Sequence, residues 1–189
     1  GGSPRAAVSS STDIPRPGEP EGPYVGGVEV VSGSAEDPGA LTGRVFHDVD
    51  RDSRFDVGES GVSGVSVSNG LDVVQTDAEG RYSLPARGDF TAFVTQPAGW
   101  QVPVDAQNFA QFSYNHYPEG SPAFHYPGVA PSGALPAAVN FPLTPWRATA
   151  APRQNCVFAA DTQAENMREM EFARAGAVAD LAARQDYRS

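Results

Sequence analysis

Short runs of β-forming residues, separated by turn signals and without helical periodicity between them, constrain this chain more than any other feature. The runs cover residues 43–47, 64–68, 71–76, 81–84, 89–95 and 139–143. Asn69-Gly70 lies between two of these runs, and this dipeptide is the strongest short-range signal for a β-hairpin. Strands at this spacing predict an antiparallel β-sandwich. Pro142 lacks an N–H, so we expect it at a sheet edge or a strand end.

An acidic loop follows the first run, over residues 48–59. Its acids stand at positions 1, 3, 5, 9 and 12 of twelve, as Asp48, Asp50, Asp52, Asp56 and Glu59. This is the spacing of an EF-hand calcium loop, in which position 7, here Arg54, offers its backbone carbonyl and the last Glu offers two oxygens. Position 6 is normally Gly, so Ser53 should strain the turn or open it. Because no helical pattern flanks the loop, we expect it to join two strands.

The same acids are compatible with a solvated turn that holds no ion, since Asp and Gly are common turn residues. Against this interpretation, five carboxylates repel one another and only Arg51 and Arg54 supply positive charge within the loop. The balance favours a bound calcium ion. His47 precedes the loop and is a candidate ligand, although its position favours a side chain at a strand end.

Charge and composition exclude several classes of protein. The formal net charge is −10 and no lysine is present, which argues against nucleic acid as a partner because phosphate binding requires clustered basic residues. The single cysteine, Cys156, excludes an intrachain disulfide. No apolar run reaches the length of a membrane span, and no hydrophobic signal segment opens the chain, so we expect a mature or trimmed start.

The chain is expected to have three parts. Residues 1–40 are rich in Gly, Pro, Ser and Glu and predict a flexible leader, with 28–31 as its one plausible strand. Residues 41–145 form the sandwich. Within it, residues 97–137 are a long irregular stretch dense in aromatic side chains, which either form a docking surface or cover the open end of the sandwich. Residues 146–189 have a different character.

The last part has the pattern of an α/β unit. Residues 155–160 are a continuous apolar run, as in a strand buried on both faces, and Asp161-Thr-Gln163 ends it. A helix should begin immediately, with Thr162 and Glu165 as a capping box. One face of this helix is apolar and carries Met167, Met170, Ala177, Val178 and Leu181. A strand, a tight turn and a helix open an α/β domain whose further strands are not in this sequence.

Three groups of residues resemble known families. Residues 43–82, with the acidic loop and Thr76-Asp-Ala-Glu-Gly-Arg-Tyr82, resemble the calcium-binding B-type repeats of Gram-positive surface adhesins, which implies a transthyretin-like or Ig-like β-sandwich. Two longer segments, 112–122 (Phe-Ser-Tyr-Asn-His-Tyr-Pro-Glu-Gly-Ser-Pro) and 128–143, resemble the N-terminal domain of a branch of bacterial calcineurin-like metallophosphoesterases. Val157-Phe-Ala-Ala-Asp-Thr-Gln163 is similar to the first metal-binding strand of such enzymes.

The second and third resemblances imply a metal role for two residues. In these enzymes the first strand ends in Asp-x-His, with Gln commonly in place of His, and both side chains bind the first of two metals. Asp161 and Gln163 stand at those positions. Two residues apart at the carboxyl end of a strand, they can point to the same side. Alternatively, Asp161 only favours the start of the helix, as acids near an N-terminus do.

The resemblance implies a phosphoesterase that uses a divalent metal pair such as manganese, iron or zinc, with the remainder of the catalytic domain and a phosphoester as partners. The chain itself lacks most ligands: its histidines, His47, His116 and His125, all precede Asp161. We therefore expect a noncatalytic N-terminal domain with a structural calcium loop, inactive when isolated. The alternative is a cell-surface adhesive or stalk module. Either protein would be bacterial and secreted or at the cell surface, where calcium is plentiful.

Overall fold

The computed structural model describes residues 20–122, 125, 128–152 and 165–183. The chain divides into two compact units, residues 1–150 and residues 151–189. Among the described helices, none has the length and apolar character that crossing a membrane requires. Each unit is presented by itself below.

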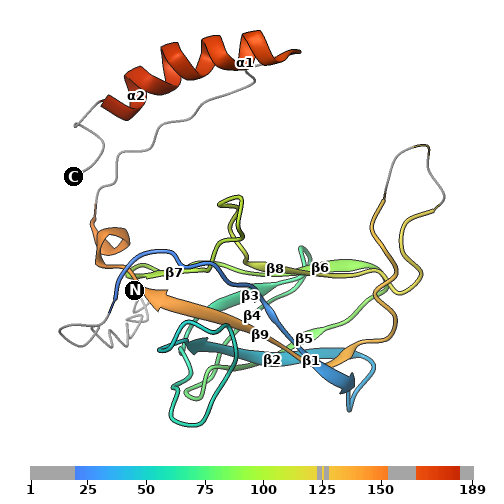
Figure 1. Ribbon diagram of the computed structural model, residues 1–189. Helices are drawn as coiled ribbons and strands as arrows, with labels where there is room; N and C mark the ends of the chain where they lie inside the picture. The colour runs from blue at the N-terminus through green and yellow to red at the C-terminus, as the bar shows by residue number, and fades with distance from the viewer. Residues whose placement is uncertain (1–19, 123–124, 126–127, 153–164, 184–189) are drawn as a thin grey trace, which may run out of the picture. The chain divides into compact units, whose positions relative to one another are not determined.

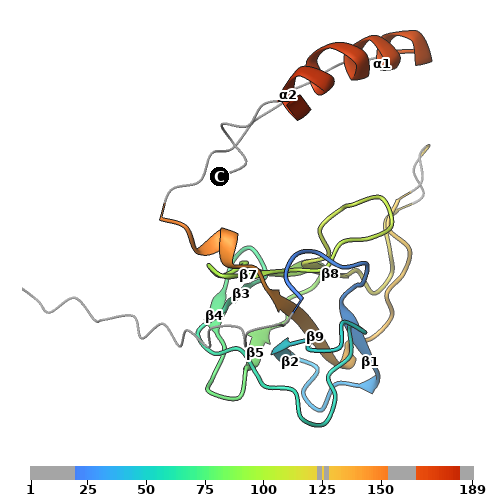
Figure 2. The same ribbon diagram turned by 60° about the vertical axis from the view of Figure 1, so that its left-hand side comes forward.

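The first unit is a two-layered β-sandwich (Figures 1 and 2). One sheet has the strand order β1-β9-β2-β5, with β7 also paired to β9, and the other has the order β4-β3-β6-β8. The strands are β1 (Glu29–Ser34), β2 (Ala40–His47), β3 (Ser66–Ser68), β4 (Val73–Gln75), β5 (Arg81–Pro85), β6 (Phe90–Val94), β7 (Trp100–Gln101), β8 (Ser113–His116) and β9 (Pro136–Pro145). The expected β-sandwich is confirmed.

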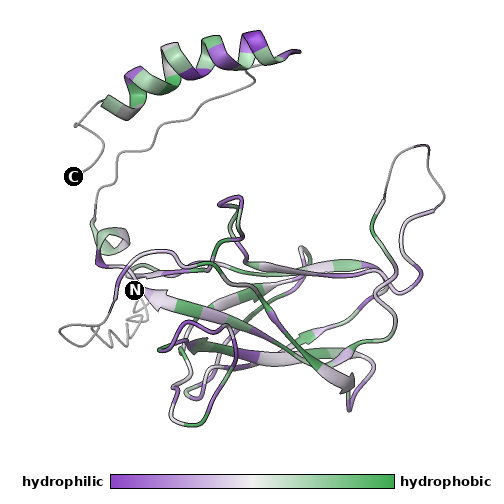
Figure 3. Ribbon diagram, in the orientation of Figure 1, coloured by the Kyte–Doolittle hydropathy of each residue, from purple (hydrophilic) through white to green (hydrophobic). Residues whose placement is uncertain are grey.

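Alternation of side chains along the strands produces the core. In β5 and β6 buried and more exposed residues alternate, as a strand with one covered face requires. Figure 3 shows the matching alternation of hydrophobic and hydrophilic residues on the ribbon. Both sheets contribute buried side chains to one cluster, including Leu41, Val45, Val67, Leu84, Ala92, Val94, Val139, Phe141 and Leu143.

Two details of the sheets differ from the sequence prediction. Strand β9 pairs with β2 in parallel, Val45 opposite Phe141, whereas all other named strand pairs are antiparallel. Strands β3 and β4 form the hairpin that Asn69-Gly70 predicts, but Ser68 pairs with Val73, so the turn has four residues rather than the two of the dipeptide. Hydrogen bonds involving the side chains of Ser68 and Asn69 hold the longer turn.

Pro142 was expected at an edge or an end, but β9 as a whole is not an edge strand, because it lies between β1 and β2. The missing N–H is nevertheless accommodated. Asn140 pairs with β1 and Thr144 pairs with β7, whereas Leu143 accepts a hydrogen bond from the Asp48 N–H on the β2 side. By alternation Pro142 faces the gap between the ends of β1 and β7, where no ladder hydrogen bond is lost.

The sandwich begins before the expected boundary at residue 41. Strand β1 lies within the predicted leader and pairs with β9 through Glu29, Val30 and Val31, so the strand expected over residues 28–31 is present but begins at Glu29 and extends to Ser34. Residues 20–28 also contact the sandwich, as the isolated bridge between Val25 and Val104 shows. Composition concealed this, because a few backbone bonds and polar contacts, rather than an apolar face, attach the segment.

The stretch 97–137 is less irregular than the sequence suggests, since it contributes β7 and β8. Both are short and lack a run of alternating apolar residues, which explains why the pattern did not reveal them. At the other boundary, the single 3₁₀ turn η1 (Arg147–Ala150) follows β9, and the Trp146 N–H donates to the Gly99 carbonyl at 2.7 Å. The sandwich therefore extends to about residue 150 rather than 145.

The second unit contains a helical segment composed of α1 (Met167–Ala173), a π-turn η2 (Arg174–Val178) and α2 (Ala179–Ala183). The expected start directly after Gln163 is wrong, because the N-cap is Asn166. Its Oδ1 accepts the N–H groups of Arg168 and Glu169, both at 3.1 Å, and the Glu169 carboxylate accepts the Glu165 N–H at 2.8 Å. Thr162 lies outside the described residues.

The apolar face of this helix is exposed to solvent. Met167 is 77% exposed and Met170 54%, and Phe172, which the periodicity places off that face, is 83% exposed. Such a face is typical of a helix that packs on a sheet.

Candidate cation site

The acidic loop leaves β2 and returns beside it. The Asp48 N–H donates to the Leu143 carbonyl at 3.0 Å, which attaches the first loop residue to β9. At the return, the His47 N–H donates to the Ser60 carbonyl and the Val62 N–H to the Val45 carbonyl, both at 2.8 Å. The loop thus joins strands, as predicted, and both of its ends are fixed by backbone bonds.

The first three acids of the loop converge. Asp48, Asp50 and Asp52 each present a carboxylate oxygen, and these oxygens all lie within 4.8 Å of one another. Calcium binds oxygen at about 2.3 to 2.6 Å, so two ligands on opposite sides of one ion are about 5 Å apart. The spacing therefore fits a single cation between the three side chains.

Asp48 differs from the other two because it is buried, with 1% of its surface exposed. Its Oδ2 accepts the Ser53 N–H at 2.9 Å and the Tyr24 hydroxyl, and its Oδ1 accepts the Asp52 N–H at 3.2 Å. Asp52 in turn accepts the Arg54 N–H at 2.7 Å. These bonds wrap the backbone around the carboxylates.

The acidic loop contains two residues in the left-handed backbone conformation, which is usually adopted by Gly. Ser53, at the position usually held by Gly, has φ of +67°, and Arg51 has φ of +65°. Both residues therefore lie in the left-handed region that disfavours a Cβ. Ser53 is held there because its N–H donates to Asp48 and its Oγ accepts the Gly27 N–H at 3.0 Å. The expected strain is present, and local hydrogen bonds offset it.

Glu59 closes the loop. Its Oε1 accepts the Val49 N–H at 2.8 Å and its Oε2 accepts the Asp56 N–H at 3.0 Å. Both oxygens of the last acid are thus directed at the loop. Among the described acids the converging group consists of Asp48, Asp50 and Asp52, so Asp56 and Glu59, predicted for positions 9 and 12, are not members of it.

The electrostatics of the loop disfavour its own negative charge. Burial raises the pKa of Asp48 above its ordinary range, against the hydrogen bonds from Tyr24 and the loop backbone that lower it. Burial likewise raises the pKa of Glu59, with repulsion from Asp48 and Asp50 as a further cause. A carboxyl group with a raised pKa is one whose ionised form is under-compensated, which is the condition that a bound cation relieves.

His47 is a strand-end side chain, as its position suggested. Its ring meets the Trp100 ring edge-on, with 5.1 Å between ring centroids. It is not a member of the converging acidic group. Asp161 and Gln163, the predicted ligands of a catalytic metal, lie outside the described residues.

Sequence reasoning missed the residues that lie behind the loop. Tyr24 and Gly27 contact Asp48 and Ser53, and the Glu29 carboxylate accepts the Phe55 N–H at 3.1 Å and the Asn140 amide at 2.7 Å. All three come from the predicted leader. Its only distinguishing signal was Tyr24, an isolated aromatic residue in a segment that is otherwise small and polar.

Comparison with protein families gives one match. Residues 50–126 match the model described as the N terminal of calcineurin-like phosphoesterase. This stretch is therefore similar to the N-terminal domain of calcineurin-like phosphoesterases. The match includes the segment 112–122 on which the resemblance rested, whereas 128–143 lies beyond it. Searches of curated proteins and of solved structures found no match.

The matched stretch begins inside the acidic loop. Asp50, Asp52, Asp56 and Glu59 lie within the matched stretch, and Asp48 lies just outside it. Residues 20–29, which contact the loop from behind, are also outside the match. The family is one of divalent-metal enzymes, and the acidic triad of this chain has the chemistry to hold a divalent cation.

Proposed function

We propose that this chain supplies the noncatalytic N-terminal domain of a metal-dependent phosphoesterase, which hydrolyses phosphate esters at a divalent metal pair in the parent enzyme. The match of residues 50–126 to the N-terminal domain of calcineurin-like phosphoesterases carries the proposal. In this assignment residues 155–163 form the first strand of the catalytic domain, and Asp161 and Gln163 bind one metal of the pair. Manganese, iron and zinc are the candidate metals.

Two residues cannot form such a site. A two-metal centre holds ions about 3.5 to 4 Å apart with several ligands each, so that both the attacking and the leaving oxygen are stabilised. Asp161 and Gln163 offer only a few oxygens, and no histidine follows them in this sequence. The remaining ligands are assigned to the rest of the catalytic domain, which is the principal partner of this chain.

Phosphatase assays on two proteins test the assignment. Chain 1–189 should not hydrolyse an aryl phosphate monoester or diester above background with manganese, iron or zinc. A protein that continues into the catalytic domain should be active, and Asp161→Asn should remove most of that activity. Turnover by chain 1–189 that disappears with Asp161→Asn would contradict the proposal, as would an extended protein that is indifferent to this substitution.

The acidic loop is proposed to bind a structural calcium ion. Support comes from the EF-hand spacing, from the three oxygens within 4.8 Å of one another and from the raised pKa values of Asp48 and Glu59. Asp48, Asp50 and Asp52 are assigned as ligands, and Glu59 and Asp56 complete the set as carboxylates. The Arg54 carbonyl is assigned to position 7.

A thermal melt with calcium or with chelator tests this site. A ligand that binds only the native state stabilises it by RT ln(1 + [L]/Kd), which is about 2.7 kcal/mol at a hundredfold excess over Kd. We expect a clearly higher melting temperature in calcium, and magnesium at the same concentration should stabilise less, because it prefers a smaller octahedral site. A melting temperature that does not respond to calcium would exclude the site.

A surface adhesive or stalk module is the second candidate. A sandwich with an acidic loop at one end suits such a module, and Phe109 is 68% exposed in the long aromatic stretch. The family match favours the enzyme. Calcium loops of low affinity suit the millimolar calcium outside cells, so we place the parent protein at a bacterial surface or in its surroundings. Coding sequence after Ser189 with the Gly-Asp and Gly-Asn-His motifs of phosphoesterases would decide between the two candidates.

A further inference from the structure

The segment of residues 20–28, here called the strap, contacts two distant parts of the sandwich. Towards its C-terminal end it lies against the acidic loop, where the Tyr24 hydroxyl donates to Asp48 and the Gly27 N–H donates to Ser53 Oγ. In its N-terminal half the Arg51 guanidinium donates to the Pro20 carbonyl at 2.5 Å. The loop therefore holds the strap from both sides of Tyr24.

The strap also contacts the point where the chain leaves the sandwich. The Glu21 carboxylate accepts the Arg147 N–H at 3.0 Å and forms an ion pair with its guanidinium, with 3.0 Å between Oε1 and Nε. The Gly22 N–H donates to the Pro145 carbonyl at 3.4 Å. Pro145 ends β9 and Arg147 begins η1, so these contacts hold the exit segment, residues 145–150.

The strap has a third contact, with the backbone of Val104. The Gly26 N–H donates to the Val104 carbonyl and the Val104 N–H donates to the Tyr24 carbonyl, both at 2.9 Å. These bonds form a short parallel bridge. A displacement of Tyr24 would break the bridge to Val104, and with it the hydrogen bond that positions Gly26. The residues of the strap near Tyr24 are therefore expected to move together.

We infer that the strap couples the acidic loop to the exit segment, so that the state of the loop controls how firmly residues 145–150 are held. Asp48 is the shared residue, because one oxygen binds the strap while its carboxylate also belongs to the converging triad. A cation on the triad would fix the Asp48 carboxylate and with it Tyr24, which strengthens docking of the strap. This last step rests on the calcium site proposed above; the coupling itself does not.

Two neighbouring glycines provide a matched test. A Cβ on Gly26 would lie 2.2 Å from Ser53 Oγ and 2.6 Å from a ring carbon of Tyr24, whereas a Cβ on Gly27 would meet no atom within 4 Å. Gly26→Ala should therefore lift the strap from the loop, and Gly27→Ala, which keeps the N–H that bonds to Ser53, should leave it docked. Hydrogen exchange by mass spectrometry, in chelator, reads out peptides that contain Gly22 and Arg147.

We expect Gly26→Ala to speed exchange at Arg147 at least about tenfold, since a lost hydrogen bond to a charged group has an effect of this size, and to speed exchange at Gly22 as well. Gly27→Ala should change it little. Tyr24→Phe is a milder second variant that keeps the ring, and Tyr82→Phe is its control, since Tyr82 donates to the Val139 carbonyl in the core. Faster exchange at Arg147 in Tyr24→Phe, but not in Tyr82→Phe, supports the coupling.

Two results would overturn the inference. One is faster exchange at residues 24–27 with no change at Gly22 and Arg147, which would mean that the strap hinges locally. The other is an equal response to Gly26→Ala and Gly27→Ala, which would mean that close approach to the loop is not what holds the strap. Both readings are made without calcium and so do not depend on the proposed site.

A calcium titration of the wild-type chain separates the two proposals. Binding seen by calorimetry, together with slower exchange at Arg147, supports both. Binding without any change at Arg147 overturns the coupling and leaves the calcium site in place. Absence of binding excludes the calcium site, and the variants in chelator still decide the coupling.

Discussion

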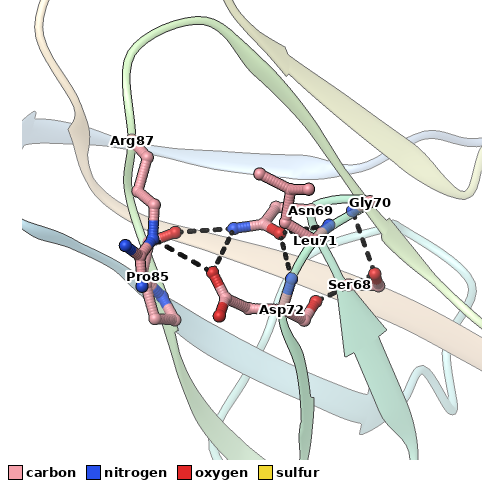
Figure 4. A network of polar contacts seen from close by, with 7 residues as sticks. All are labelled: Ser68, Asn69, Gly70, Leu71, Asp72, Pro85 and Arg87. Carbon is pink, nitrogen blue, oxygen red and sulfur yellow. Dashed lines mark hydrogen bonds and ion pairs between the residues drawn. The ribbon is translucent and has the colours of Figure 1, made fainter.

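Two turns of the sandwich carry clusters of polar side chains, and they balance charge in opposite ways. In the turn of residues 69–72 the Asp72 carboxylate has positive and amide partners of its own: Arg87 Nε donates to Oδ2 at 3.2 Å, and Asn69 Nδ2 lies 3.4 Å from the same oxygen (Figure 4). In the acidic loop Asp48 accepts hydrogen bonds from the backbone N–H groups of Asp52 and Ser53 and from the Tyr24 hydroxyl, none of which carries charge.

The rest of the 69–72 turn is equally self-contained. Asn69 Oδ1 accepts the N–H groups of Leu71 and Asp72, and Asn69 Nδ2 donates to the Pro85 carbonyl at 2.8 Å. Ser68 Oγ donates to the Asp72 carbonyl and accepts the Gly70 N–H. This turn balances its charge within the chain, whereas the acidic loop gathers carboxylates whose charge a bound cation would neutralise. The difference teaches that local charge balance, more than the number of acids, marks a candidate ion site.

The largest expected effect is that of Asp48→Ala in saturating calcium. It removes a proposed ligand, and with it the stabilisation that calcium binding adds to the folded state, which is up to about 2.7 kcal/mol at a hundredfold excess of calcium over Kd. It also leaves the Ser53 N–H and the Tyr24 hydroxyl without their acceptor, at about 1–3 kcal/mol. Urea denaturation should show a loss of about 4 kcal/mol. Asp72→Ala, the control from the balanced turn, should lose about 1 kcal/mol or less, and equal losses would remove the distinction between the turns.

Glu59→Gln should abolish most of the calcium response while changing the calcium-free protein little. The substitution takes away one charge and one of two oxygens. Without calcium the loss of an acceptor is offset by relief of repulsion from Asp48 and Asp50, which is one cause of the raised pKa of Glu59. Glu79→Gln removes the same charge from an exposed turn and is the control in thermal melts. A full calcium shift in Glu59→Gln would exclude Glu59 as a ligand.

The pH dependence should reverse sign with calcium. Because the folded-state pKa values of Asp48 and Glu59 are raised, the native state binds more protons than the unfolded state between the unfolded and folded pKa values. Stability of the calcium-free protein from these two groups is then greatest at acid pH and is lost as pH rises through the folded pKa values. With calcium bound, the ionised forms are favoured, so acidification should destabilise. Melts from pH 4 to 7 measure this, and the same sign in both conditions would contradict it.

How far the sequence predicted these features depended on how local their causes are. The hairpin at Asn69 and the acidic spacing from Asp48 are encoded within a few residues, and both turns form where expected. Strand β1 depends on pairing with β9, more than a hundred residues away in the sequence. The contact of Tyr24 with the loop depends on a single hydroxyl. Neither feature leaves a periodic pattern in the sequence. The parallel pairing of β9 with β2 likewise depends on tertiary structure, and it determines where a proline can be accommodated in β9.

The smallest expected effect belongs to Arg87→Ala. The Arg87 side chain is 66% exposed, and its ion pair with Asp72 is a surface pair of the kind worth about 0.2–1 kcal/mol. The turn keeps its Asn69 and Ser68 hydrogen bonds, so we expect a loss of about 0.5 kcal/mol that weakens with salt and is the same with calcium or chelator. Urea denaturation in both conditions tests this. A loss that depends on calcium would mean that the two turns are coupled through the sheet. It would contradict the view that the 69–72 turn balances its charge independently of the acidic loop.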